Sequence, residues 1–456
     1  MRSIGSHRTS LALCIIALLA CKQAKDDSPA GERPDDERGS VTKPEPHGAQ
    51  ISGVTTGTLK PGPAYLAVTN AGIVKLDGGK TVMVQPLRFS IQDLVYGGDG
   101  AVWVSAVSGV YRIQGSESKQ INTSGGFQGL AVVSSKDAYA VNYKGLHHYD
   151  GSSWTIEDKA KIGVTLLRDV EVDRDGNVWV TSSNALLSKK KGSDAWTEAD
   201  VSAEIKGKPF FKELAKGPDG TLYASVSGGL LKLENGKWKK VAGDFGFGGT
   251  DHVSVGPTGT VVALSGTKRL HVLGPGGQTQ IDPASANLKA SSFKQVAIDG
   301  SGRIWIATDY GLVVVDEKGK TIAQWPPSTL PGVTGEISHI VVTGAGPTNL
   351  PKPTAPVTGT VKGKVLKSGS PAAGADLELC ASPSMVFKST PCEGRAFKKT
   401  TRTSATGEFS IPDVPIASYG FAVKTPGAKW MITLGSDCCS KMKQGMEYDV
   451  GAIKLK

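Results

Sequence analysis

A seven-fold internal repeat between Tyr65 and Trp305 constrains this chain more than any other feature. Each copy contains a turn rich in Gly and Asp, a strand with an aromatic residue or Val at a fixed place, a second turn and another apolar strand. The fixed place is occupied, at intervals of 38, 36, 40, 44, 39 and 43 residues, by Tyr65, Trp103, Tyr139, Trp179, Tyr223, Val262 and Trp305. A period of about 40 residues built from short strands is typical of a β-propeller, whose four-stranded blades pack against their neighbours.

The two ends of the repeat array indicate how the ring of blades closes. Every complete copy follows an apolar strand, but the first copy has no such strand before it. The missing strand is found after the last copy, at residues 338–342, with no outer strands behind it. We expect one blade to be built from both ends of the domain, because this pairs the two sheet edges that a linear array leaves open. The sequence therefore predicts an all-β, seven-bladed propeller over residues 51–345.

Residues 1–20 have the organisation of an export signal. Arg2 and Arg8 precede an apolar run that is too short to span a bilayer as a helix and that ends in Leu-Leu-Ala-Cys at residues 18–21. This segment resembles a bacterial lipoprotein signal peptide, and the resemblance implies cleavage before Cys21 and lipidation of Cys21. The alternative is an ordinary secretory signal with an incidental cysteine.

The residues after Cys21 indicate where the anchored protein resides. Lys22 is not the Asp that commonly retains such lipoproteins in the inner membrane, so the resemblance implies the outer membrane, facing the periplasm or exposed on the surface. Residues 21–50 are expected to form the lipidated Cys and a disordered tether, because they contain almost no large apolar side chain. A flexible segment of this length spans roughly 30 Å.

A second domain is expected after a proline-rich linker at residues 346–356, which contains four prolines. Residues 357–456 hold short strands separated by Gly and Pro turns, the pattern of a small antiparallel β-sandwich. The segment resembles the carboxypeptidase-regulatory-like, transthyretin-related family at Gly359, Gly363, Val365, Pro371, Gly374, Ala375, Thr406, Gly407, Glu408, Phe409, Tyr419, Gly451 and Leu455. An insertion from Cys380 to about Thr400 departs from the family's pattern.

The cysteines suggest a disulfide-stabilised domain. Cys14 leaves with the signal peptide and Cys21 carries lipid, so the structural cysteines are Cys380, Cys392, Cys438 and Cys439. An exported protein meets an oxidising compartment, so two disulfides are expected among these four. Since bonding between adjacent cysteines has poor geometry, we expect one of Cys438 and Cys439 to reach Cys380 and the other to reach Cys392. A Cys₄ zinc site is the weaker alternative, because paired C-x-x-C spacing and histidine are both missing from residues 357–456.

Composition excludes several function classes. Removal of Arg2 and Arg8 takes the 52 basic residues to 50 against 42 acidic residues, a mature charge of +8. These basic residues are scattered, which argues against nucleic-acid binding. The sequence contains no nucleophile elbow, HExxH, P-loop or dinucleotide fingerprint. Residues 173–177 resemble a calcium loop, but the equivalent segments of other copies share only a Gly turn, so a cofactor is not expected.

The repeat register gives a candidate binding site. In a propeller the innermost strand of each blade runs along the central channel, so equivalent residues at its start form a ring at one mouth. We refer to this set as the mouth ring, and its members are Asp93, Gly129, Asp169, Glu213, His252, Gln295 and His339. The loops after each second strand open on the same face, where Tyr143 and Tyr310 are candidates for stacking on a sugar. These polar residues either bind a small molecule, glycan or metal, or merely meet water and satisfy backbone groups.

The blade sequence resembles two propeller families. Residues 298–308 with Gly311 and Leu312, and residues 172–181, are similar to the two-component-regulator propeller repeat. In that family the propellers form extracytoplasmic sensory regions of hybrid histidine kinases and contact glycan-derived ligands or each other. This sequence contains no kinase, regulator or transmembrane segment, so the resemblance implies a binding scaffold.

Residues 217–223 resemble the repeats of the streptogramin lyases, seven-bladed enzymes with a histidine base and a magnesium site. That resemblance implies catalytic roles for His252, His339 and Glu213 if the chain is an enzyme, although the family's histidine motif is not recognisable. The favoured hypothesis is a non-enzymatic, lipid-anchored surface protein that recognises a glycan, small molecule or protein partner. The alternative is a metal-dependent lyase or hydrolase.

Overall fold

The computed structural model describes residues 59–455, apart from positions 70, 88–89, 98, 243–244, 246–248, 275–276, 285, 287, 289, 382 and 434–437. The signal peptide, Cys14, Cys21 and the tether predicted for residues 1–50 lie outside this part of the chain. Within it, α1 (Lys159–Ile162) is the single α-helix and the remaining elements are strands. No helix among the described residues has the length and apolar composition needed to cross a membrane.

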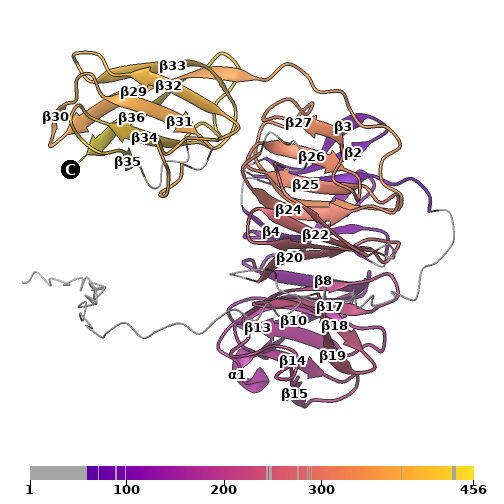
Figure 1. Cartoon of the computed structure of the whole chain (residues 1–456). Helices are drawn as coiled ribbons and strands as arrows, with labels where there is room; N and C mark the ends of the chain where they lie inside the picture. The colour runs from indigo at the N-terminus through magenta and orange to yellow at the C-terminus, as the bar shows by residue number, and fades with distance from the viewer. Residues whose placement is uncertain are drawn as a thin grey trace, which may run out of the picture. The chain divides into compact units, whose positions relative to one another are not determined.

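Seven four-stranded antiparallel sheets in the described part form the blades, and Figure 1 colours their strands in chain order from indigo to orange. The first three blades contain β1 (Ala64–Val68), β2 (Gly72–Asp77), β3 (Lys80–Pro86) and β28 (Ile337–Val342); β4 (Ile91–Tyr96), β5 (Val102–Ala106), β6 (Gly109–Gln114) and β7 (Glu117–Asn122); and β8 (Gly129–Ser134), β9 (Asp137–Val141), β10 (Gly145–Tyr149) and β11 (Trp154–Asp158). The next two contain β12 (Leu167–Val172), β13 (Val178–Ser182), β14 (Leu186–Lys189) and β15 (Trp196–Glu198), and β16 (Phe211–Lys216), β17 (Leu222–Val226), β18 (Gly229–Glu234) and β19 (Lys237–Ala242). The last two contain β20 (Thr250–Val255), β21 (Val261–Ser265), β22 (Arg269–Gly274) and β23 (Gly277–Ile281), and β24 (Phe293–Ile298), β25 (Ile304–Thr308), β26 (Gly311–Val315) and β27 (Thr321–Trp325).

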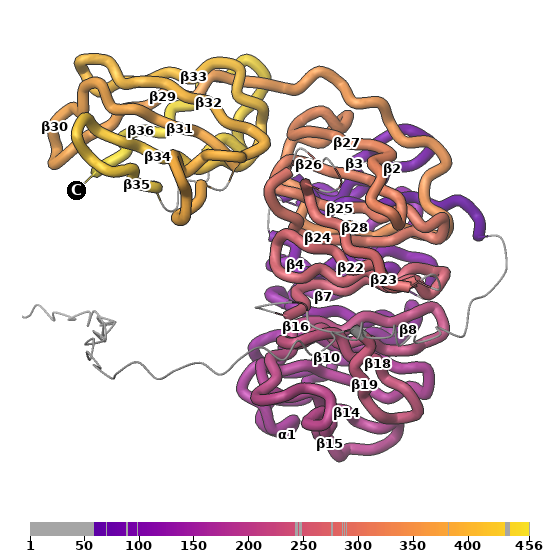
Figure 2. The backbone as a smooth tube through the Cα atoms, viewed as in Figure 1, coloured from indigo at the N-terminus to yellow at the C-terminus, as the bar shows by residue number. Residues whose placement is uncertain are grey.

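The first blade is assembled from both ends of the propeller, as the repeat pattern predicts. Strand β28 pairs with β1 in antiparallel register, with Leu66 opposite Ile340. In Figure 2 the indigo strands β2 and β3 belong to this blade, together with orange β28 from the other end of the domain. The prediction of a seven-bladed propeller closed by a shared blade is confirmed.

The second strand of each blade explains why these sequences stack as blades. Strands β1, β5, β13, β17, β21 and β25 are buried at every position. Both faces of a blade pack against neighbouring blades, so alternation of buried and exposed residues gives way to a fully buried and mostly apolar run. Trp103 and Trp305, at the repeated aromatic position, have no exposed surface.

The Asp of the repeated turn is hydrogen-bonded to the tryptophan at the repeated aromatic position and to the backbone of the turn. One carboxylate oxygen of Asp173 accepts hydrogen bonds from the backbone N–H groups of Asp175 and Asn177, at 3.0 and 2.9 Å. The other accepts from the Asn177 side chain and from Trp179 Nε1, both at 2.9 Å. Asp299 and Trp305 repeat the aromatic bond, also at 2.9 Å. The turn thus uses the Asp oxygens that a calcium loop would direct at an ion.

The C-terminal domain is a sandwich of two sheets. One contains β29 (Thr358–Lys367), β30 (Ser370–Pro371), β33 (Glu408–Pro415) and β36 (Glu447–Leu455). The other contains β31 (Asp376–Cys380), β32 (Lys398–Arg402), β34 (Gly420–Lys424) and β35 (Met431–Ile432). Val365, Leu379 and Phe421 are completely buried in its core. Strand β36 joins β29 in parallel, a pairing that the expected antiparallel pattern did not include.

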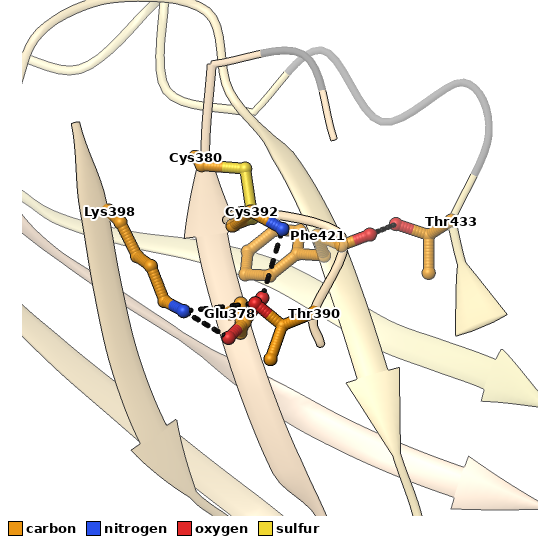
Figure 3. Close-up of a disulfide and its surroundings, with 7 residues drawn as sticks. All are labelled: Glu378, Cys380, Thr390, Cys392, Lys398, Phe421 and Thr433. Atoms are coloured by element: carbon orange, nitrogen blue, oxygen red, sulfur yellow. Dashed lines mark hydrogen bonds and ion pairs between the residues drawn. A yellow bond between two sulfur atoms is a disulfide. The ribbon is translucent and has the colours of Figure 1, made fainter. Parts of the chain in front are cut away.

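The disulfide pairing differs from the expectation. Cys380, at the end of β31, bonds to Cys392, and their Cα atoms are 5.8 Å apart (Figure 3). Cys438 bonds to its neighbour Cys439, whose φ of 87° lies in the left-handed region. The predicted bonds from Cys438 and Cys439 to Cys380 and Cys392 are therefore wrong. The insertion after β31 folds back on itself, which places Cys392 within disulfide range of Cys380.

The segment predicted as the linker, residues 346–356, is hydrogen-bonded to the last blade over its first half. The Arg303 guanidinium donates to the carbonyl oxygens of Ala345 and Pro347, at 3.0 and 2.9 Å. Trp325 Nε1 donates to the Pro351 carbonyl oxygen at 2.9 Å. These bonds tie the chain to the propeller for several residues beyond the closing strand.

Candidate functional site

The mouth ring lies at the start of the innermost strands. An innermost strand has only one hydrogen-bonded neighbour, so its other edge presents free backbone groups to the channel. A β-bulge precedes or includes the ring position in six of the seven described inner strands, β4, β12, β16, β20, β24 and β28. Bulges bend a strand and re-aim its side chains, which places the ring side chains against the neighbouring blade.

Ring side chains join consecutive blades. In four cases a side-chain oxygen accepts a hydrogen bond from the backbone N–H one residue beyond the ring position of the next blade. Asp93 accepts from Leu130 at 2.9 Å, and Asp169 accepts from Leu214 at 2.7 Å. Glu213 accepts from Val253 at 2.9 Å, and Gln295 accepts from Ile340 at 2.7 Å. The free N–H groups of the channel edge are satisfied in this way at four blade junctions.

Five ring residues line one axial cavity of about 770 Å³, namely Asp93, Asp169, Glu213, His252 and Gln295. Gly129 and His339 lie beside it, through their neighbours Leu130 and Ile340 in the lining. The structure therefore brings the predicted residues together. It also shows that several of these side chains bond to the next blade, so they contribute to the fold as well as to the cavity wall.

Burial and mutual repulsion raise the pKa values of two carboxyl groups in the ring. Burial, followed by the charge of Glu213, raises the pKa of Asp93 to about 7. Burial and the charges of Asp93 and Glu213 raise the pKa of Asp169 well above its usual range. Both groups are therefore held toward the neutral form at the channel mouth.

The pKa values of the two ring histidines are shifted in opposite directions. Burial lowers the pKa of His252, but the Glu213 carboxylate, which is hydrogen-bonded to His252 Nδ1, more than compensates and the pKa is raised. Burial and the positive charge of His252 lower the pKa of His339 to about 4, against a hydrogen bond to the Gln92 backbone. The pKa of His252 is thus shifted toward the protonated form that pairs with Glu213, whereas the pKa of His339 is shifted toward the neutral form.

A charged pair farther along the inner strands was missed by sequence reasoning. Lys216 Nζ lies 3.1 Å from Glu171 Oε2, across adjacent inner strands β16 and β12. Glu171 is 8% exposed and also accepts the backbone N–H of Val172 at 2.9 Å. Both residues line the axial cavity. The repeat register could have found them, because equivalent positions in most other inner strands are apolar or small.

The two candidate stacking residues are described and lie outside the cavity lining. Tyr143 is 61% exposed, and Lys144 Nζ lies 5.8 Å from its ring centroid. Tyr310 is half-buried and its backbone N–H donates to Thr308 Oγ1 at 3.0 Å. Because Asp93 pairs with Ser105 at the end of the second strand, the loops that follow second strands are at the same mouth as the ring.

No group of three or more His, Cys, Asp or Glu side chains in the described part of the chain has the arrangement of a metal site. The zinc, magnesium and calcium alternatives therefore find no supporting cluster among these residues.

Comparison with known proteins places the chain at a distance from characterised families. No family model matches it, and no curated protein is significantly similar to it. A solved structure of the extracellular domain assigned to a hybrid two component system from B. thetaiotaomicron has 15% identity and a TM-score of 0.46, covering 56% of this chain and 37% of that one. This chain therefore spans little more than a third of that structure.

Two enzymes are among the other similar structures. A streptogramin B lyase has 14% identity and a TM-score of 0.43, covering 57% of this chain and 86% of that one. A gluconolactonase from Xanthomonas campestris has 13% identity and a TM-score of 0.37, covering 57% of this chain and 96% of that one. Similarity at this level assigns neither an activity nor a ligand to this chain.

Proposed function

We propose that this chain is a lipid-anchored envelope protein whose propeller binds a small, hydroxyl-rich ligand, such as a glycan unit, in the axial cavity without converting it. The anchor follows from the Leu-Leu-Ala-Cys sequence at residues 18–21. Membrane attachment at Cys21 and a ligand on the propeller make the protein a recognition scaffold. Nucleic acid is not a partner in this proposal.

The axial cavity is the observation that carries the proposal. Its volume of about 770 Å³ falls in the range of small-molecule sites. Asp93, Asp169 and Gln295 already accept backbone N–H groups, so much of their hydrogen-bonding capacity is used. The Lys216–Glu171 pair offers a donor and an acceptor side by side on the wall, an arrangement suited to vicinal hydroxyl groups.

A binding screen with matched lysine variants tests this proposal. The full-length chain is screened against glycans and polar metabolites, and each hit is titrated by calorimetry. Lys216→Met should weaken binding roughly 10-fold or more, because a charge-assisted hydrogen bond is lost. Lys232→Met is the control, since Lys232 pairs with Glu234 at 2.9 Å on the same strand, β18, outside the cavity lining. Ligands whose affinity is indifferent to Lys216→Met would place recognition elsewhere and overturn the proposal.

One observation favours a lyase or hydrolase as the second candidate. The Glu213 carboxylate holds His252 through Nδ1 at the cavity, and a carboxylate-oriented imidazole is the arrangement of a general base. We expect no bond cleavage when ester and lactone substrates are incubated with the protein. Turnover that is abolished both by His252→Gln and by a chelator would show a metal-dependent enzyme instead.

A further inference from the structure

The sandwich carries an exposed apolar apex that the propeller hypothesis does not use. It lies in the insertion between β31 and β32, where Met385, Val386 and Phe387 are 73%, 89% and 39% exposed. We refer to residues 385–387 as the apolar apex. Elsewhere among the described residues, large exposed apolar side chains occur singly or as the pair Val82 and Met83. Three consecutive ones at the end of a loop indicate a surface that is covered by something apolar.

The base of this insertion is held at two points, drawn in Figure 3. The Cys380–Cys392 disulfide closes it at the end of β31. Beside the disulfide, the Glu378 carboxylate, only 3% exposed, accepts the backbone N–H of Cys392 at 3.1 Å and the Lys398 ammonium at 2.5 Å. Lys398 also donates to Thr390 Oγ1 at 3.1 Å. The buried Glu378 carboxylate therefore links β31, β32 and the segment that contains Thr390 and Cys392.

The turn that presents the apex is ordered by its own hydrogen bonds. The backbone N–H of Ser384 donates to the Pro391 carbonyl oxygen at 2.8 Å and joins the two sides of the loop. The Ser384 hydroxyl donates to the Val386 carbonyl oxygen at 2.6 Å and accepts the Val386 N–H at 3.2 Å. Ser389 N–H donates to the Glu393 carboxylate at 2.9 Å. An apex fixed in this way loses little conformational entropy when it binds.

The charge around the apex indicates what covers it. Between residues 381 and 399 the basic residues are Lys388, Arg395, Lys398 and Lys399, and the single acidic residue is Glu393. Lys388, directly after the apex, is exposed. Exposed apolar side chains followed directly by an exposed lysine suit shallow insertion into an anionic membrane surface, where the apolar side chains enter the acyl boundary and the lysine meets the head groups.

We propose that the apolar apex, residues 385–387, inserts into an anionic lipid surface and is a membrane contact separate from Cys21. The proposal rests on exposure, loop order and charge in the sandwich, so it does not depend on the ligand of the propeller. The covering partner is the bilayer itself rather than another protein.

A probe at the apex tests this in the full-length chain with Cys14 and Cys21 replaced by Ser, so that no other free thiol takes the label and no acyl chain binds the vesicles. A polarity-sensitive fluorophore is attached to Val386→Cys, after thiol titration shows that Cys380, Cys392, Cys438 and Cys439 remain bonded, and the protein is mixed with phosphatidylcholine vesicles with or without phosphatidylglycerol. We expect a blue shift, and quenching by lipids labelled in the acyl chain, only with phosphatidylglycerol. The same probe at Val82→Cys, a propeller site that is 56% exposed, is the matched control and should not respond.

Two variants separate the apolar and electrostatic contributions. Met385→Ser/Phe387→Ser should lower the lipid-bound fraction of the probe roughly 10-fold, since most of the inserted apolar surface is removed. Lys388→Gln/Lys399→Gln should weaken the response and reduce its dependence on salt. A probe at position 386 that stays in water with phosphatidylglycerol vesicles, or that responds equally to both lipids, overturns the proposal. Shielding of the probe by a protein partner without vesicles also overturns it.

Discussion

Asp169 illustrates how one side chain connects two blades. Its carboxyl oxygens accept the backbone N–H of Val170 on its own strand and of Leu214 on the next inner strand, at 2.8 and 2.7 Å. Both N–H groups belong to strand edges that no further strand covers. The ring is therefore part of what holds the blades in register around the channel, as well as a candidate ligand surface.

Replacement of Asp169 should destabilise the propeller. Asp169→Ala leaves two backbone N–H groups without their acceptor, which should lower the free energy of unfolding by about 2 kcal/mol. Urea unfolding followed by circular dichroism measures the change. Asp175→Ala removes an exposed carboxylate from the neighbouring turn and should have little effect. Equal stability of the two variants would show that the bond to Leu214 contributes nothing.

Asp93 should make stability depend on pH in a defined window. Burial, followed by Glu213, raises its pKa to about 7 in the folded state, against about 3.9 for an unfolded chain. Between these values the folded state binds more protons, so the contribution of Asp93 to stability is present at low pH and is lost as the pH rises through 7. The expected slope is at most ~1.4 kcal/mol per pH unit.

The measurement is a set of unfolding curves at several pH values for the unmodified chain and for Asp93→Asn. The amide keeps an oxygen for Leu130 but does not titrate, so this variant should have a flatter profile between pH about 4 and 7. Parallel profiles in this window would contradict the assignment to Asp93.

At the scale of elements, the closing strand β28 should decide whether the propeller folds. Truncation after Pro331 removes β28, exposes the edge of β1 and uncovers the apolar face of the last blade that packs against Ile337 and Ile340. The resulting loss of stability should exceed the ~5–15 kcal/mol of a typical domain or produce an aggregate. Truncation after Pro353 keeps β28 and the bond from Trp325 to Pro351, and should melt cooperatively. Calorimetry of both products is the test. Cooperative melting of the shorter product would mean that the shared blade is dispensable.

Repetition explains which elements could be predicted from the sequence. Seven copies contain the same strand, turn and aromatic position, so a strand that is hard to recognise in one copy is identified from the others. The unpaired strand at residues 338–342 then has only the first blade to complete. The sandwich has no such redundancy. The parallel pairing of β36 and the partner of Cys380 depend on how the insertion after β31 folds back, and no local pattern encodes that.

The candidate site was predictable in position but not in its bonding. The repeat register placed Asp93, Asp169 and Glu213 at one mouth, because equivalent residues of a propeller share a height along the channel. It could not show that these carboxylates point toward the next blade. A β-bulge before Asp93 and before Asp169 inserts an extra residue and so alters which way the following side chains point. The bonds between blades followed only from the three-dimensional register.

For the whole molecule, the proposals place membrane contacts on both sides of the propeller in the sequence, at Cys21 and at residues 385–387. Acyl chains on Cys21 would hold the protein firmly, because each buried CH₂ contributes roughly 0.8 kcal/mol. The apolar apex contributes only a few side chains and basic charges. The two contacts should therefore differ greatly in strength and in sensitivity to salt.

Cys21→Ser should separate the two contacts in cell fractions. Without lipidation, we expect either release of the protein from membranes or an unprocessed chain of larger mass. A released chain should retain a weak association that high salt removes and that Met385→Ser/Phe387→Ser abolishes, because only electrostatic attraction and the apex remain. Mass spectrometry and membrane fractionation at low and high salt measure these outcomes. The same mass and the same salt-resistant membrane association after Cys21→Ser would refute the anchor, since neither acyl chains nor a retained signal would then account for the attachment.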